Sequence, residues 1–291
     1  MVGLGLAVLA ACGGGTAVCH RDGGAACFEL PTEVMGTYGP GGISDPLSIG
    51  CGAIVPTPAA MAVTLGGVLT DYSSNQPVVG ATFEVFEDGD HEGTPIASAT
   101  TDGSGAYSMT LPSGTSDLLT GAIAGGGVIP ELREQLRPDL GQATAALDLT
   151  TGTAELLDEV AQGVGVDRDA GLGQVWVRVL DCNRFAITHA VVVLSATPGV
   201  RDFIDGVPLY YSTAGAPFPL PTADGITATT NDGAAVALNV PVAGAQYVQA
   251  WGFVDAAAAA RGDEAGLVLV AEHAVSRRAG TITRVELWAN Q

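Results

Sequence analysis

The chain has 291 residues, with 31 acidic side chains, 11 basic side chains and a formal charge of −20 at pH 7. All the basic residues are arginine, and so acidic a chain repels phosphate backbones and anionic headgroups, which argues against a nucleic-acid partner. The 41 glycines, 16 prolines and few aromatic residues argue against a helical bundle and favour all-β domains, about two for this length.

Residues 1–11 are uncharged and apolar and end in small residues directly before Cys12. Such a segment is too short to span a membrane and has the apolar region and cleavage site of a signal peptide. Residues 9–12 (LAAC) resemble the lipobox of bacterial lipoproteins, in which the cysteine is acylated. The resemblance implies a lipid anchor at Cys12 and a place in the bacterial cell envelope, in the outer membrane or periplasm. Because no positive charge follows Met1, a chain that stays in the cytosol is the alternative.

Residues 12–60 form a Gly- and Pro-rich segment that we interpret as a tether. With Cys12 acylated, four cysteines remain, and they can pair as disulfides in three ways. They are Cys19, Cys27, Cys51 and Cys182. Disulfides would give the tether a shape that its few apolar residues cannot. The alternative is a zinc site in which His20 joins the tether cysteines, although the short C-x-x-C spacing is missing.

Residues 61–150 alternate strand-like runs with turn signals. We expect strands at 63–69, 78–86 and 106–112, with turns at 71–75 and 101–105. The same order of signals recurs about 110 residues later, which predicts a second copy within 173–291. Its expected strands are 177–181, 190–194, 238–241, 246–254, 266–275 and 281–288, with a turn at 230–233. A long insertion, 198–226, contains prolines that argue against regular structure there.

The first copy resembles the carboxypeptidase regulatory-like domain, a small transthyretin-like β-sandwich. The family's motif is carried here by Val68, Asp71, Val79, Gly80, Ala81, Val85, Thr101, Asp102, Gly105, Tyr107, Leu111, Pro112 and Gly114. The second copy departs from it, with His189 in the place of the glycine and Val236 in the place of the tyrosine. The resemblance implies two transthyretin-like or Ig-like sandwich domains, at 61–150 and 173–291, and no catalytic residues.

A short helical interlude is expected between the copies. Residues 130–137 (PELREQLR) begin with a proline, which is favoured in a first helical turn, and are rich in helix-forming residues. In the connector 151–172, Thr153 is a suitable N-cap for a second helix. Its apolar stripe predicts a packing face that closes one sandwich or fixes the two together. The stripe comprises Leu156, Leu157, Val160, Ala161 and Val164.

Motifs for catalysis are missing from the sequence. No G-x-S-x-G elbow occurs, and Ser104 between two glycines is better explained as a turn. The four histidines form no H-E-x-x-H pattern, and a chain without lysine has no phosphate-binding Gly-Lys. We therefore expect a protein that is not an enzyme and has no cofactor, with a role in adhesion, scaffolding or ligand display. The alternative is an extracytoplasmic carbohydrate-binding or accessory module.

Two further sets of residues are candidate contacts. Acidic loops suit calcium, but the second loop lacks the full ligand pattern, so solvated loops are the favoured interpretation. The candidate ligands are Asp88, Asp90, Asp167 and Asp169. Aromatic residues in the insertion 198–226 could contact a protein or glycan partner, because loops of a sandwich commonly carry recognition. These are Tyr210, Tyr211 and Phe218.

Overall fold

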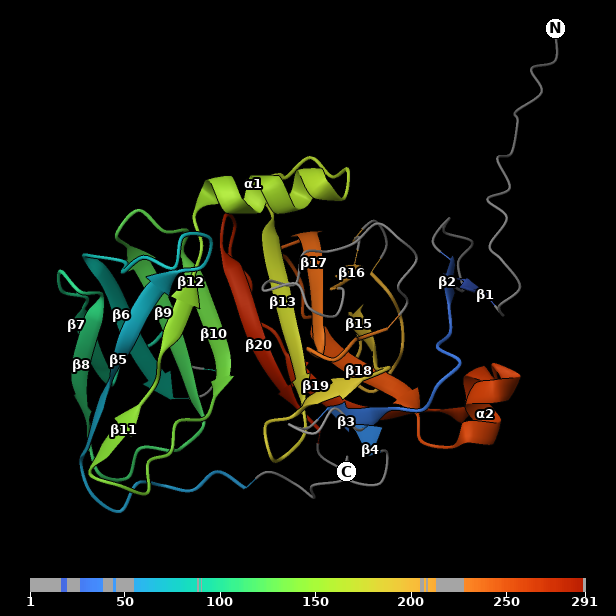
Figure 1. Cartoon of the computed structure of the whole chain (residues 1–291), viewed down its shortest axis with the longest axis horizontal. Helices are drawn as coiled ribbons and strands as arrows, with labels where there is room; N and C mark the ends of the chain where they lie inside the picture. The colour runs from blue at the N-terminus through green and yellow to red at the C-terminus, as the bar shows by residue number, and fades with distance from the viewer. Residues whose placement is uncertain are drawn as a thin grey trace, which may run out of the picture.

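The computed structural model describes residues 30–38, 55–87, 89, 91–204, 207, 209–212 and 228–289 in full, and the backbone of 17–19, 27–29 and 44–45. Within these ranges the chain is mostly strand, as predicted (Figure 1). The helical elements are α1 (Ala154–Gly163), α2 (Ala256–Arg261) and the 3-10 turn η2 (Glu264–Gly266). None of the described helices has the length and apolar character needed to cross a membrane.

The first half of the structure is a β-sandwich. Its strands are β5 (Val63–Asp71), β6 (Ala81–Glu87), β7 (Ala97–Thr100), β8 (Ala106–Leu111), β9 (Leu119–Gly125), β10 (Glu131–Leu136), β11 (Thr144–Ala146) and β12 (Leu149–Thr151). One layer has β8 on one edge of β5 and β11 and β12 on the other, and the facing layer runs β7-β6-β9-β10. The inward side chains form one core, in which the rings of Phe83 and Tyr107 meet edge to face with centroids 5.1 Å apart.

The second half is also a β-sandwich. Its strands are β13 (Gly173–Leu180), β14 (Ala186–Thr188), β15 (Val191–Ser195), β16 (Leu209–Tyr211), β17 (Ala234–Val240), β18 (Tyr247–Phe253), β19 (Leu267–Ala274) and β20 (Ile282–Trp288). A layer β15-β18-β19 faces a layer that contains β16, β17, β13 and β20, and a second core lies between them. Because β16 lies inside the insertion 198–226, the expectation of irregular structure there is wrong at this point.

The predicted tether contributes to the second core. Within it, the structure places the antiparallel pair β1 (Ala17–Cys19) and β2 (Cys27–Glu29), together with β3 (Gly36–Tyr38) and β4 (Ser44–Asp45). Strand β3 pairs antiparallel with β14, and the neighbouring Met35 is fully buried among the core residues of the second sandwich. Part of this segment is therefore built into the sheet.

A single sheet joins the two cores. β20 pairs parallel with β13 on one side and parallel with β10 on the other, so that one 11-stranded sheet passes through both sandwiches. The prediction of a helix at 130–137 is therefore wrong. Leu132 and Leu136 are buried, and their spacing of four suits one face of a helix or of a strand. The segment is a strand because its backbone forms hydrogen bonds with β9 and β20 on its two sides.

The sandwiches repeat each other's hydrogen bonds, as the recurring signals predicted. In the first, Leu69 N donates to Gly105 O at 2.9 Å, and in the second Val179 N donates to Gly233 O at 2.9 Å. Both glycines have positive φ, near +75° and +67°, which explains why a glycine closes each turn.

The turn of the second copy begins one residue before the predicted range 230–233. Ala81 N donates to Thr101 Oγ1 at 3.0 Å, and Ala190 N donates to Thr229 Oγ1 at 2.9 Å. Thr229, and not Thr230, is therefore the equivalent of Thr101. In both copies the threonine hydroxyl accepts a hydrogen bond from the backbone N–H at the start of a strand.

Two other positions of the family motif can be compared in the same way. His189 does replace Gly80, because both adopt positive φ, +58° and +75°. The place of Tyr107, two residues after the turn glycine, belongs to Ala235 rather than Val236. The small side chain at 235 lies in the second core, where a tyrosine ring would not fit without displacing its neighbours.

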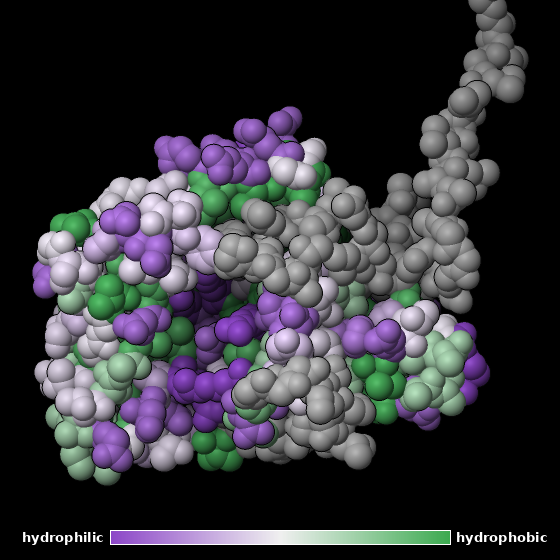
Figure 2. Space-filling view, viewed as in Figure 1, coloured by the Kyte–Doolittle hydropathy of each residue, from purple (hydrophilic) through white to green (hydrophobic). Residues whose placement is uncertain are grey.

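Helix α1 begins as predicted. Thr153 Oγ1 accepts from Leu156 N at 3.4 Å, and Leu157, Val160 and Ala161 are buried. They pack on a cluster that includes Trp176 and Ile282 of the shared sheet, while polar side chains cover the outer side of the helix (Figure 2). The apolar stripe is thus confirmed as a packing face. Tyr72 of the first sandwich packs against the same cluster, so α1 lies over the junction of the sandwiches.

Candidate functional site

A cleft of about 700 Å³ opens where β10 leaves the first sandwich. One wall is formed by residues 57–61 and Asp117, and the other by 137–141 and the turn at 182–184 that follows β13. Both sandwiches therefore contribute to it. Apart from charged and small residues, its lining contains Met61, Leu140 and prolines, and no aromatic ring.

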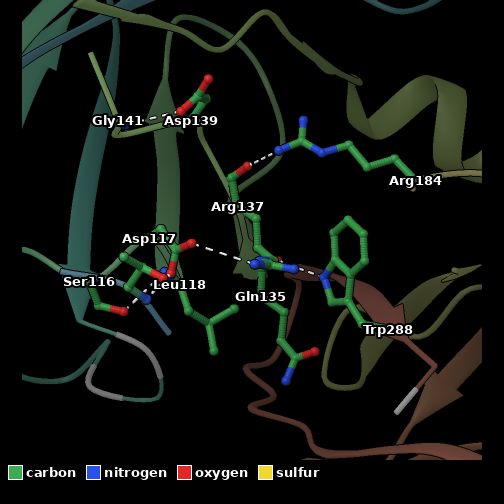
Figure 3. Close-up of polar contacts among 10 residues, drawn as sticks. Ser116, Asp117, Leu118, Gln135, Arg137, Asp139, Gly141, Arg184 and Trp288 are labelled. Atoms are coloured by element: carbon green, nitrogen blue, oxygen red, sulfur yellow. Dashed lines mark hydrogen bonds and ion pairs between the residues drawn. The ribbon is translucent and has the colours of Figure 1, made fainter. Parts of the chain in front are cut away.

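Arg137 is held in place at the base of this cleft. Its guanidinium lies 3.5 Å from Asp117 Oδ2 and stacks over the ring of Trp288, with 5.3 Å between the guanidinium carbon and the ring centroid (Figure 3). Trp288 Nε1 donates to the carbonyl of Gln135 at 3.2 Å, which fixes the ring. Arg137 Nε is buried without a hydrogen-bond partner among the described residues.

Arg184 reaches the same place from the second sandwich. It adopts φ near +67° in a turn that Asp181 closes, since Asp181 Oδ1 accepts from the N–H groups of Asn183 and Phe185 at 2.8 Å. Its guanidinium donates to the carbonyl of Arg137, and the side chain is otherwise exposed (Figure 3). Two arginines from different sandwiches therefore converge on one wall.

Two carboxylates also belong to the lining of the cleft. Asp117 accepts from Thr57 N at 2.7 Å in addition to its ion pair with Arg137. Asp139 is exposed and accepts from Gly141 N at 3.0 Å through one oxygen. The lining thus offers strong donors and strong acceptors side by side and has no net charge of its own.

A further carboxyl lies on the shared sheet near the arginines. Glu286 of β20 is directly opposite Arg178 of β13, and it also feels the charges of Arg133, Arg137 and Arg184. Burial raises the pKa of Glu286 above its ordinary value, and the arginines offset only part of that effect. The charged form is thus disfavoured despite its cationic neighbours. Figure 2 shows that this face of the molecule is hollowed below α1 and that hydrophilic residues line the hollow.

A buried ionic network connects the two sandwiches. Glu131 Oε1 lies 2.6 Å from Arg133 Nε and 2.8 Å from Arg284 Nε, and Glu131 Oε2 accepts from Thr151 Oγ1 at 3.0 Å. Arg284 lies over the ring of Trp176 at 4.8 Å, and burial lowers its pKa to about 10. Removing water from these charges makes any loss of one partner costly, so the network is a structural element of the junction.

The opposite face of β10 carries a second polar cluster. Glu134 Oε2 lies 3.2 Å from His273 Nε2, Gln135 Nε2 lies 2.7 Å from His273 Nδ1, and Ser276 N donates to Glu134 Oε1 at 3.0 Å. Ser276 Oγ in turn lies 3.1 Å from His91 Nδ1. A histidine beside a carboxylate can serve general acid–base chemistry, but His273 and Glu134 are both nearly buried and do not line the cleft. The cluster ties the loop at His91 to the second sandwich.

The structure separates the predicted aromatic contacts. The ring of Tyr211 is buried in the second core, and its hydroxyl accepts from Val192 N at 2.9 Å. Tyr210 points to the other face of β16 and packs against the α1 cluster. These two rings therefore cannot form one exposed platform, and the expectation for Tyr211 is wrong because a core position takes its ring. Phe218 lies outside the described residues.

The acidic loop at 167–171, the weaker calcium candidate, is held by hydrogen bonds within the loop and to Asn239. Asp169 Oδ1 accepts from Gly171 N at 2.7 Å, and the carbonyl of Asp167 accepts from Asn239 Nδ2 at 2.9 Å. Among the residues that the structure describes, no three His, Cys, Asp or Glu side chains gather as metal ligands would. Asp88 and Asp90 lie outside the described residues.

The predicted cysteine sites are described only in part. Cys19 and Cys27 are directly opposite each other in the backbone of β1 and β2. Cys182 lines the cleft in the turn after β13. Cys12, His20 and Cys51 lie outside the described residues, as does the predicted signal peptide.

Sequence reasoning missed the cleft. Its charged residues are Asp117, Arg137, Asp139 and Arg184. They come from three separate segments of the chain, at 117, 137–139 and 184, and no motif joins them. One usable signal was the clustering of a rare residue. Three of only 11 arginines stand between 133 and 168, and two more stand at 178 and 184.

No protein-family model and no curated protein matches this sequence. Three of the solved structures that match over much of the chain have low identity and low TM-scores. The Bacillus anthracis TIE protein is 12% identical with a TM-score of 0.24, and the match covers 79% of this chain and 35% of that protein. The shaft pilin SpaA from Lactobacillus rhamnosus GG is 11% identical with a TM-score of 0.23, covering 81% of this chain and 99% of the pilin. A streptococcal ancillary pilin is 9% identical with a TM-score of 0.22, covering 79% of this chain and 62% of that one.

The strand pairing defines the class of this protein directly. It is a β-sandwich protein in which sheets of mixed parallel and antiparallel strands enclose two cores and one sheet runs through both. Likenesses at such low TM-scores add nothing to that assignment.

Proposed function

We propose that the protein is a non-enzymatic scaffold of the bacterial cell envelope that displays two transthyretin-like sandwich domains as one rigid unit. The observation that carries this proposal is the parallel pairing of β10 with β20. It makes the sandwiches share a sheet, and the Glu131 network buries charges from both beside that pairing. A flexible linker would let the two domains move relative to each other, whereas a shared sheet fixes the distance between them.

The proposed domains are residues 61–150 and 173–291, joined by 151–172. The support is the repeated pattern of hydrogen bonds at the turn glycines and threonines, which each half forms within itself. Carboxypeptidase regulatory-like domains remain the family that the motif residues of the first half resemble. The proposal gives the connector helix α1 the role of a brace over the junction.

The anchor is proposed to be an acyl group on Cys12 after removal of residues 1–11. Disulfides would then hold the segment that leads from the anchor. The opposition of Cys19 and Cys27 in β1 and β2 supports a pairing between them, because a bridge needs Cα atoms about 4.4–6.8 Å apart. Cys51 is left to pair with Cys182.

Metabolic labelling tests the anchor. The full chain and Cys12→Ala are expressed in a Gram-negative host with an alkyne-tagged palmitate, and cells are fractionated before and after external proteinase treatment. We expect label and membrane association for the wild type and for the control Cys182→Ala, and loss of both for Cys12→Ala. A wild-type chain without label in the cytosolic fraction would contradict the proposal.

A further inference from the structure

We propose that the cleft between residues 57–61 and 137–141 binds an acidic saccharide, with Arg184 and Arg137 taking the sugar carboxylate. This inference goes beyond the scaffold role and does not depend on the lipid anchor. The volume of about 700 Å³ falls in the range of small-molecule sites, roughly 300–1,000 Å³.

The arginine pair supplies the recognition of a carboxylate. Arg137 is oriented before any ligand arrives, because Asp117 and the ring of Trp288 hold its guanidinium. Arg184 is exposed and uses one N–H for the carbonyl of Arg137, which leaves the rest of its planar fork to face solvent. The bond from Arg184 to the main-chain carbonyl of Arg137 brings both arginine side chains, from separate sandwiches, to the lining of the cleft. Arginine forks match a carboxylate through paired hydrogen bonds.

The carboxylates of the lining determine what else the ligand carries. Asp117 and Asp139 are acceptors that would repel a second negative charge near the first, and the chain as a whole has a formal charge of −20. A polyanion such as an acidic peptide or a nucleic acid is disfavoured on both counts. A sugar ring with one carboxylate and several neutral hydroxyls fits, because hydroxyls donate well to Asp139 while the carboxylate lies on the arginines.

Calorimetric titration of the purified full chain with galacturonic acid, which carries one carboxylate, tests the proposal, with its methyl ester as the uncharged control. We expect the acid to bind, the ester to bind at least about tenfold more weakly, and Arg184→Gln to weaken the acid by roughly 10- to 100-fold, as one charge-assisted hydrogen bond would. Asp139→Asn should reduce affinity for both saccharides. Arg261→Gln is the matched control, because this exposed arginine pairs with Asp263 outside the cleft and should leave binding unchanged.

Four results would overturn the inference. They are no heat of binding with the acid at millimolar concentration, equal affinity for acid and ester, unchanged affinity in Arg184→Gln, and tighter binding of hexaglutamate than of the saccharide. Circular dichroism of Arg184→Gln confirms that the exposed substitution leaves the fold intact. Because the titration needs no membrane, its failure would leave the labelling result on Cys12 untouched.

Discussion

Glu131→Gln isolates the contribution of the buried charge network to the junction. The substitution preserves the size of the side chain but removes the negative charge that two guanidinium groups share. The Glu131 side chain is 0% exposed, and those of Arg133 and Arg284 are only 11% and 21% exposed. The two arginines would then face each other across the strand pairing without a counter-charge.

The expected loss of stability follows from that burial. Removing one partner of a buried ion pair costs about 3–5 kcal/mol, because the remaining charge stays desolvated and unpaired. The exposed pair of Arg261 and Asp263 provides the comparison, since its side chains are 60% and 44% exposed and 3.7 Å apart. Removing that pair should cost about 1 kcal/mol or less.

Urea unfolding followed by far-ultraviolet circular dichroism measures the stability of Glu131→Gln and of the surface variant Arg261→Gln. The free energy of unfolding is taken by linear extrapolation. A triple variant, Glu131→Gln with Arg133→Met and Arg284→Met, should recover most of the lost stability, because it leaves no unpaired charge. A loss below about 1 kcal/mol in Glu131→Gln would refute the reasoning, as would a triple variant less stable than the single one.

Three other substitutions test two further places in the fold, the surroundings of the Leu147 carbonyl and the buried Glu286. Gly67→Ala should destabilise the first sandwich by roughly 3 kcal/mol in the same urea assay, because a Cβ there would lie 2.1 Å from the carbonyl oxygen of Leu147. Tyr107→Phe removes the hydroxyl that donates to that carbonyl and should cost about 1–2 kcal/mol; no loss would mean that water replaces the bond. Burial raises the pKa of Glu286, so its contribution to stability is fully present below the unfolded pKa near 4.5 and is lost as pH rises through the folded value. Glu286→Gln should therefore raise the melting temperature at pH 7 and flatten its dependence above pH 4.5, and a melting temperature lowered at pH 7 would contradict the assigned direction.

Local signals predicted most of the strands and turns because those signals act over a few residues. The turn at 101–105 needs only Asp102, whose carboxylate accepts from Ser104 N at 2.8 Å, and a glycine at 105. Thr153 likewise caps α1 with its own hydroxyl. Strands at 246–254, 266–275 and 281–288 were expected within one or two residues of β18, β19 and β20.

The junction and the cleft depend on distant partners and could not be found in this way. β10 has the composition of a helix, and its charged residues find their partners at Thr151, His273 and Arg284. Nothing within 130–137 indicates those partners, so propensity alone gave the wrong element. The burial of Tyr211 is similar, since only the pairing of β16 with β17 turns its ring into the core.

The position of β20 also sets an order for folding. Its seven residues lie between β13 and β10, yet they follow every other described strand in the chain. Until β20 pairs with them, β10 and β13 each have an edge of unpaired backbone N–H and C=O groups. Such edges can pair with strands of other chains. Assembly is therefore held back until late in the chain, and contacts so far apart in sequence form slowly. An exported chain that first folds outside the cytoplasm would need its partly formed sandwiches shielded during that interval.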